Sequence, residues 1–235
     1  MSYEDVKLFP ISYTKIAKFE TCPFQWLESY VNKNIKFIPN EKTEWGKAVH
    51  DAFDKRFKIK VPMSGRFESY EQYAKTLENL PGKLISEYEI VIDEEGKRVG
   101  WWDESAYMRA KVDVCILQDT KAVVFDHKTG GRRNSEELEF FVVIMFFLHP
   151  EVDDIKTIYA WYKEPGCPLD VEYFNRVNDF GRLLDKFNGK IAKIQEALEF
   201  DKFPKKKSGL CKDYCGSTTC VHSGSFVKFP PVGPV

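Results

Sequence analysis

Apolar residues recur at helical spacing in the first third of the chain. Between Glu41 and Phe57 the bulky apolar residues stand four positions apart: Trp45, Val49, Phe53 and Phe57. This stripe predicts an amphipathic helix. Two shorter helices are expected before it, one that Ser12 can cap and one whose first turn Pro23 suits. A more polar helix is expected from Glu68 to Leu80.

The pattern then changes to short runs that are rich in β-branched and aromatic residues. Five such runs predict strands: Ile85 to Ile92, Met108 to Leu117, Lys121 to His127, Ile155 to Tyr162 and Asp170 to Phe174. A helix from Ser135 to Leu148 separates the third and fourth runs, and its apolar composition predicts burial against a sheet. A last helix is expected from about Asn178 to Phe200. This order predicts an α/β fold, in which α-helices flank a central mixed β-sheet.

We expect the chain to form one domain over residues 1–228. Its expected parts are a helical part (12–84), a sheet core (85–176), a C-terminal helix with a cysteine-containing segment (177–224) and a flexible tail (229–235).

The charge composition limits where the protein could contact nucleic acid. The chain has 35 basic and 36 acidic residues, a formal net charge of −1, so the whole protein does not attract nucleic acid. Any contact with DNA would have to come from local basic groups such as Arg132 with Arg133, or Lys205 to Lys207. The sequence shows no secretory signal and no apolar stretch of transmembrane length, so we expect a cytoplasmic protein with free or metal-bound cysteines.

Two aspartates lie on the predicted hairpin near the middle of the chain. If Asp119 and Thr120 form a two-residue loop, counting back from it places Asp113 directly opposite Asp126. Facing carboxylates lie roughly 5 Å apart and repel each other unless a cation lies between them. A solvated sheet face is the alternative, but aspartate is uncommon inside strands. The pair therefore favours a metal site.

Other residues near this pair predict phosphodiester chemistry. Lys128 projects from the same face as Asp126 and could stabilise charge on phosphoryl oxygens. Two carboxylates with a backbone carbonyl, that of His127, suit Mg²⁺ or Mn²⁺. His50 would be a further ligand, although taken alone it is an ordinary helix histidine.

Glu137 opens the helix after a glycine turn, where helix-start amides and Arg132 or Arg133 could hold DNA phosphates. An acidic residue also suits a helix N-terminus without any function. Glu87 and Glu89 lie on the preceding strand and could also approach the metal, but solvation of a strand edge is the expectation for both.

Three cysteines stand close together after a basic run: Cys211, Cys215 and Cys220, with His222 just beyond. Their polar surroundings are typical of metal ligands rather than of core cysteines. A zinc site could use these thiols with His222 or Cys22, and unligated thiols on an exposed segment are the remaining alternative. Cys115 is expected to be a small core residue.

The order of these motifs resembles a known family. It runs from Cys22 before Pro23, through the segment from Gly46 to His50, to Asp113, then Asp126 with Lys128, and then the helix that Glu137 opens. This set is similar to the PD-(D/E)XK nucleases of the RecB type, and among them to phage-encoded exonucleases and CRISPR-associated adaptation nucleases. The similarity spans Ser12 to about His222.

The resemblance implies a restriction-endonuclease-like core and assigns roles to residues. His50, Asp113 and Asp126 would bind the metal, and Lys128 would act in catalysis. The family often has a Gln-x-x-x-Tyr pair on the next helix, where this chain has Glu137 and Phe141. Many relatives hold a [4Fe-4S] cluster with one N-terminal and three C-terminal cysteines, which implies the ligands Cys22, Cys211, Cys215 and Cys220.

We therefore expect a metal-dependent deoxyribonuclease, an exonuclease by analogy with the family, that acts in DNA recombination, repair, phage replication or degradation. Two alternatives remain open. One is a catalytically inactive accessory protein that binds DNA and retains the fold. The other is a nuclease that works only with a recombination or adaptation partner. Cleavage polarity, strand preference and oligomeric state are not predicted.

Overall fold

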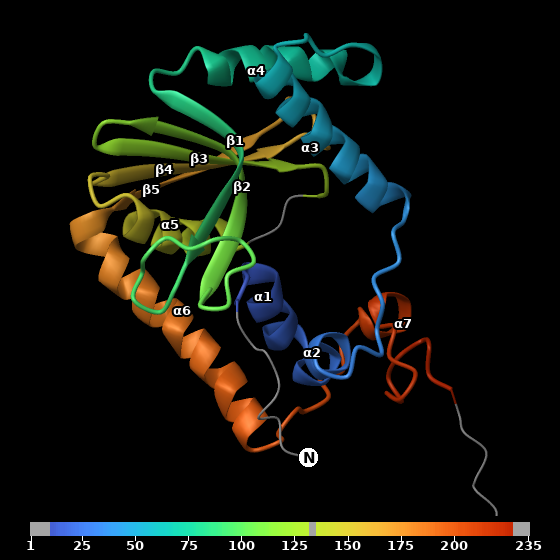
Figure 1. Ribbon diagram of the computed structural model, residues 1–235. Coiled ribbons are helices and arrows are strands. Elements are labelled where there is room, and N and C mark those ends of the chain that lie inside the picture. Colours follow the sequence, from blue (N-terminus) through green and yellow to red (C-terminus); the bar gives the residue numbers. More distant parts are fainter. Residues whose placement is uncertain (1–9, 132–134, 228–235) are drawn as a thin grey trace, which may run out of the picture. The chain divides into compact units, whose positions relative to one another are not determined.

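The computed structural model describes residues 10–131 and 135–227 (Figure 1). The chain divides into two compact units. The sheet unit comprises residues 10–12 and Pro39–Asn188, and the helical unit comprises Tyr13–Ile38 with residues 189–227. This division crosses the three segments expected from the sequence, because the long third helix belongs with the sheet while the first two helices belong with the cysteine segment. The expected tail, 229–235, lies outside the described residues.

The sheet unit is built on five strands in the order of the chain. They are β1 (Lys83–Ile92), β2 (Met108–Gln118), β3 (Lys121–Lys128), β4 (Asp154–Trp161) and β5 (Leu169–Asn175). Only β3 and β4 pair in parallel, and the other neighbours pair antiparallel. The predicted mixed sheet with flanking helices is therefore confirmed.

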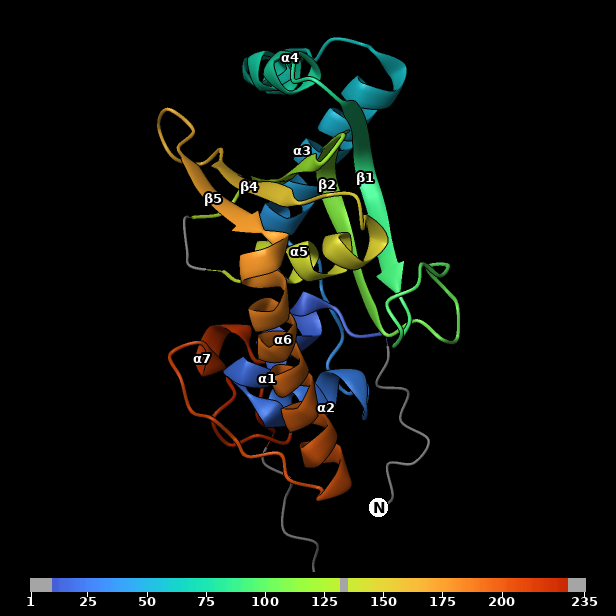
Figure 2. The ribbon, with the colours of Figure 1, turned by 90° about the vertical axis from the view of Figure 1, so that its left-hand side faces the viewer.

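Helices cover both faces of this sheet (Figure 2). Between β3 and β4 the chain crosses over through α5 (Glu137–Leu148), as a parallel connection requires. From Phe140 to Phe146 all residues of α5 are buried, which explains its apolar sequence. On the other face, α3 (Glu41–Ile59) packs Val49 and Phe53 against Phe125 and its neighbours in the core.

The start of α3 is set by a capping box, in which the Asn40 side chain accepts from the Thr43 backbone N–H. The predicted helix from Glu68 to Leu80 is instead a 3₁₀ turn (Gly65–Tyr70) followed by α4 (Glu71–Glu78). Buried Arg56 ties α3 to α4 through ion pairs of 3.0 Å with Glu71 and 2.9 Å with Glu78. These pairs orient the helix that carries His50.

The helical unit contains α1 (Tyr13–Thr21), α2 (Pro23–Tyr30), the second half of α6 (Arg176–Glu199) and α7 (Cys211–Tyr214). Trp26 of α2 is buried and stacks on Phe203 with ring centroids 6.1 Å apart, which joins the N-terminal helices to the C-terminal segment. In the described ranges, no helix has both the length and the apolar composition needed to cross a membrane.

Candidate metal centre

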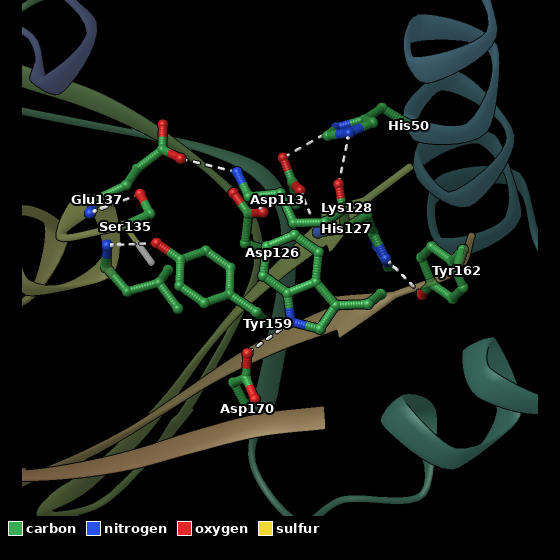
Figure 3. Close-up of polar contacts among 12 residues, drawn as sticks. His50, Asp113, Asp126, His127, Lys128, Ser135, Glu137, Tyr159, Tyr162 and Asp170 are labelled. Atoms are coloured by element: carbon green, nitrogen blue, oxygen red, sulfur yellow. Dashed lines mark hydrogen bonds and ion pairs between the residues drawn. The ribbon is translucent and has the colours of Figure 1, made fainter. Parts of the chain in front are cut away.

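The hairpin of β2 and β3 has the predicted register. Gln118 pairs with Lys121, and Asp119 in the two-residue loop takes a left-handed φ of 42°. Backbone pairing continues to Val114 with Phe125 and ends there, so that Asp113 and Asp126 are the next residues in register. The candidate centre lies at this fork, where the ladder stops (Figure 3).

Asp113 replaces the missing ladder contacts with its side chain. Its Oδ2 accepts from the backbone N–H of His127 at 2.7 Å, and its Oδ1 lies 3.1 Å from Nδ1 of His50. The other ring nitrogen of His50, Nε2, lies 3.0 Å from the carbonyl oxygen of His127. A carboxylate and a carbonyl can only accept, so both nitrogens of His50 donate and the ring is an imidazolium.

The electrostatics agree with that assignment. Burial lowers the pKa of His50, but its hydrogen bond to Asp113 and the charges of Asp113, Asp126 and Glu87 outweigh burial and raise the pKa to about 9. Burial raises the pKa of Asp113, but the hydrogen bond and charge of His50 hold it below its usual range. His50 and Asp113 therefore form a charged pair in the metal-free protein.

Asp126 and Lys128 share the other side of the fork. The Lys128 ammonium lies 2.7 Å from Oδ2 of Asp126 and 2.7 Å from Oε2 of Glu137, at the start of α5. Burial and the charge of Asp113 raise the pKa of Asp126 to about 7. Apart from this ion pair with Lys128, the buried Oδ2 has no hydrogen-bond partner within the described residues.

Glu87 is the residue that the sequence offered only as the less favoured alternative. It stands opposite Asp113 in the register of β1 and β2 but has a φ of 49°, and this step of the ladder is not paired. One ligand atom each of His50, Glu87 and Asp113 all lie within 4.8 Å of one another. The expectation of a solvated edge is therefore wrong for Glu87, whereas Glu89 is exposed as expected.

His127 contributes its backbone and not its side chain. Because it lies between Asp126 and Lys128, its ring points to the opposite face of β3. There Nδ1 lies 2.7 Å from the Tyr162 hydroxyl, and the ring stacks on Phe53 with centroids 3.8 Å apart. Burial lowers the pKa of His127 to about 3. The predicted ligand can only be its carbonyl oxygen, which faces His50.

These residues suit a hard divalent cation. They offer carboxylate oxygens, a backbone carbonyl and one imidazole, and Oδ2 of Asp126 is buried with no partner but Lys128 among the described residues. Arg132 and Arg133, the predicted phosphate contacts, lie outside the described residues.

The cysteine cluster forms a separate feature inside the helical unit. All four predicted ligands line one pocket of about 70 Å³: Cys22, Cys211, Cys215 and Cys220. None of them is in a disulfide. Within the described chain no three of these sulfurs lie within 4.8 Å of one another. Cys115 is fully buried in the sheet unit, where burial raises its pKa to about 12, as expected for a core residue.

Comparisons with known proteins agree with this architecture. A family model described as the PD-(D/E)XK nuclease superfamily matches residues 10–107, a stretch that contains His50 and Glu87 and ends before Asp113. A crystal structure from Eubacterium rectale, of a protein with the provisional name exonuclease, aligns with a TM-score of 0.51 and 11% identity over 94% of this chain and 90% of that chain. This likeness concerns the fold alone.

The crystal structure of SSO0001 aligns with a TM-score of 0.45 and 16% identity, over 92% of this chain and 87% of that chain, and carries no argument. No curated protein matches the sequence. Over residues 10–107 the chain is thus similar to the PD-(D/E)XK nuclease superfamily, and its fold resembles that of the Eubacterium rectale protein.

The pH dependence of stability tests the pair of His50 and Asp113. Because the pKa of His50 is about 9 in the folded protein and about 6.5 when unfolded, the pair stabilises the fold fully below pH 6.5, and this contribution is lost as pH rises through 9. We expect the melting temperature of metal-free protein to fall between pH 7 and 9.5, and to fall less in His50→Gln. Equal slopes in thermal denaturation of the two proteins would contradict the pairing.

Binding of Mn²⁺ tests the place of Glu87. We expect Glu87→Gln to raise the Mn²⁺ dissociation constant by at least about 10-fold, since even indirect partners of a metal contribute that much. Glu89→Gln removes an exposed carboxylate from the same strand and should leave the constant unchanged. Titration followed by electron paramagnetic resonance measures both; equal affinities for the two variants would remove Glu87 from the centre.

Proposed function

We propose that the protein is a metal-dependent deoxyribonuclease that hydrolyses phosphodiester bonds at the fork of β2 and β3. The observation that carries this proposal is the convergence of His50, Glu87 and Asp113 beside the pair of Asp126 and Lys128. The superfamily is one of nucleases. Four elements supply these five residues: α3, β1, β2 and β3. A purely structural ion pair has no need of five ionisable residues at one point.

Each residue has a distinct part in this proposal. Asp113, Asp126 and Glu87 supply carboxylate oxygens for Mg²⁺ or Mn²⁺, and the carbonyl of His127 supplies another oxygen. When bound, such an ion polarises a phosphoryl group and activates water. His50 would have to be neutral to serve as a ligand, and an imidazole ligand would favour Mn²⁺ over Mg²⁺.

Lys128 stabilises the charge that develops on the phosphoryl oxygens. Burial alone would lower the pKa of Lys128, but the charges of Asp126 and Glu137 raise it above its usual range, so the ammonium keeps its proton. Glu137 stands where relatives often have glutamine, and its contact of 2.7 Å holds the lysine on the face of the metal-binding carboxylates. Glu137 is therefore a positioning residue for Lys128.

An exonuclease acting on DNA ends is the specific activity that we propose. The resemblance to RecB-type exonucleases supports it, and the same resemblance is the support for a role in DNA recombination, repair, phage replication or degradation. A catalytically inactive accessory protein is less compatible with the chain, because Asp113, Asp126 and Lys128 are all retained at the fork.

Cleavage of end-labelled linear and circular DNA tests this proposal. We expect the wild type to digest linear DNA with Mg²⁺ or Mn²⁺, to spare circular DNA, and to stop in EDTA. Asp126→Asn and Lys128→Ala should each lose at least about 100-fold in rate, because each removes charge stabilisation at the reacting phosphate. Asp51→Asn, which changes an exposed carboxylate next to His50, is the matched control and should keep full activity.

Three outcomes would contradict particular parts of the proposal. Full activity of Asp126→Asn would place the reaction elsewhere. Digestion of circular DNA would replace the exonuclease with an endonuclease. No cleavage by folded, metal-loaded wild type, with or without a partner protein, would favour the accessory protein.

The four cysteines of the helical unit form a structural iron–sulfur centre in our proposal. The support is that Cys22 near the start of the chain lines one pocket with three cysteines near its end. A tetrahedral zinc ion with Zn–S bonds of about 2.3 Å needs cysteine sulfurs about 3.8 Å apart. A four-iron cluster is larger, so its cysteine sulfurs lie farther apart. The Ser208 backbone N–H lies 3.3 Å from Sγ of Cys211, a contact that stabilises a ligating thiolate.

The iron content of anaerobically purified protein tests this centre. We expect Cys215→Ala to lose the visible chromophore and to lower the melting temperature, because binding a structural metal contributes directly to folding. Cys167→Ser changes a cysteine of the sheet unit and should keep both. Stoichiometric zinc without iron would replace the cluster with a zinc site, and unchanged metal content and stability in Cys215→Ala would exclude a centre at this pocket.

A further inference from the structure

The net charge of −1 conceals a separation of charge between the two units. In its described residues the helical unit has 11 lysines against 6 acidic residues, a net charge of +5. Over its own described residues the sheet unit has 20 basic and 28 acidic residues, a net charge of −8. The unit that contains the candidate metal centre therefore repels a polyanion. On net charge, the helical unit is the one that attracts a chain of phosphates.

The positive charge is concentrated in the segment that contains the cysteines. Its exposed lysines are Lys202, Lys205, Lys206, Lys207 and Lys212. None of the ion pairs within the described residues involves them, whereas Lys111 and Lys128 of the sheet unit each contact a carboxylate. The ammonium of Lys206 donates to the carbonyl of Glu20 at 2.8 Å, and that of Lys205 lies 4.6 Å from the ring centroid of Phe24. These contacts fix two of the lysines without neutralising them.

An exposed aromatic ring lies in the same segment. Tyr214 is 70% exposed, and it lines the same pocket as Lys206. Its backbone carbonyl is 3.5 Å from the side-chain amide of Gln25 in α2. A lysine run is most often only a solvated surface, and such surfaces usually mix both signs of charge; here Asp213 lies between Lys212 and Tyr214, but the run Lys205 to Lys207 is not interrupted by an acidic residue. Unpaired lysines with an exposed aromatic ring are typical of surfaces that bind single-stranded nucleic acid.

We infer that Lys205, Lys206, Lys207 and Lys212, together with the ring of Tyr214, form a binding surface for single-stranded DNA in the helical unit. We call this surface the lysine patch. The lysines attract the phosphates. The tyrosine ring stacks on the face of an unpaired base, and the stacked base pairs of a duplex do not expose such a face. The inference rests on the proposed function, since it takes DNA as the substrate, and it assigns substrate binding and cleavage to different units.

The test measures binding in a background that does not depend on cleavage. Asp126→Asn protein without added divalent ion is titrated against a fluorescent 20-nucleotide oligothymidine, and anisotropy is recorded at several salt concentrations. Changing Lys205, Lys206 and Lys207 together to glutamine should raise the dissociation constant at least tenfold. The slope of log affinity against log salt should fall by about 2, because each lost phosphate contact contributes about 0.7 on a single strand.

Matched controls separate the patch from general charge. Changing Lys42, Lys58 and Lys97, three exposed lysines of the sheet unit, to glutamine removes the same charge and should change the constant less than twofold. Tyr214→Ala should weaken binding of the oligothymidine and leave binding of a duplex unchanged. Equal effects of the two triple variants, or tighter binding of duplex than of single strand, would overturn the inference.

Metal content distinguishes this inference from a role of the lysines in the cysteine centre. Lys206 lines the cysteine pocket and Lys207 does not, so Lys207→Gln alone should weaken binding about threefold with metal content unchanged. Unchanged affinity in Lys207→Gln, or loss of metal without loss of affinity in the triple variant, would contradict the patch. If the wild type cleaves DNA and the triple variant binds DNA normally, the inference fails and the proposed function stands. If binding depends on the lysines but the wild type does not cleave DNA, the proposed function fails and the lysine patch stands.

Discussion

Two carboxylates that face each other at the end of a ladder repel, and burial makes this repulsion stronger. At the fork of β2 and β3, burial and the charge of Asp113 raise the pKa of Asp126, and two cationic side chains balance the two carboxylates. His50 pairs with Asp113, and Lys128 pairs with Asp126. In the proposed function a divalent ion at the fork would be held by these carboxylates and by neutral His50, and Lys128 would contact the phosphate. The rest of the sheet unit serves to keep these groups together.

The fold brings these charged groups together by covering the two faces of one sheet with different helices. Helix α3 delivers His50, and its partners Phe53 and Arg56 anchor it to the core and to α4. Helix α5 crosses between parallel strands and begins at Glu137, beside Lys128. Because successive residues of β3 point to opposite faces, Asp126 and Lys128 face α5 while the ring of His127 is buried under α3. A single strand thus supplies both the site and its support.

The sequence predicted the strands, the hairpin loop and the place of Asp113, because side-chain alternation and a two-residue turn determine register by counting alone. The side-chain direction of His127 follows from the same alternation. The sequence could not distinguish Glu87 from Glu89 as a metal neighbour, since a left-handed φ in a glutamate within a strand leaves no trace in the hydrophobic pattern. The separation of charge between the units was also hidden, because the N-terminal helices and the cysteine segment join one unit only in three dimensions.

A crystal of the protein grown with Mn²⁺ and measured for anomalous scattering tests the central claim most directly. The account predicts one strong peak at the fork, within about 2.5 Å of oxygens of Asp113 and Asp126 and of a ring nitrogen of His50. It also predicts that the hydrogen bond between His50 and Asp113 is broken in that crystal. A fork that keeps this bond and contains no peak at saturating Mn²⁺ would contradict the account.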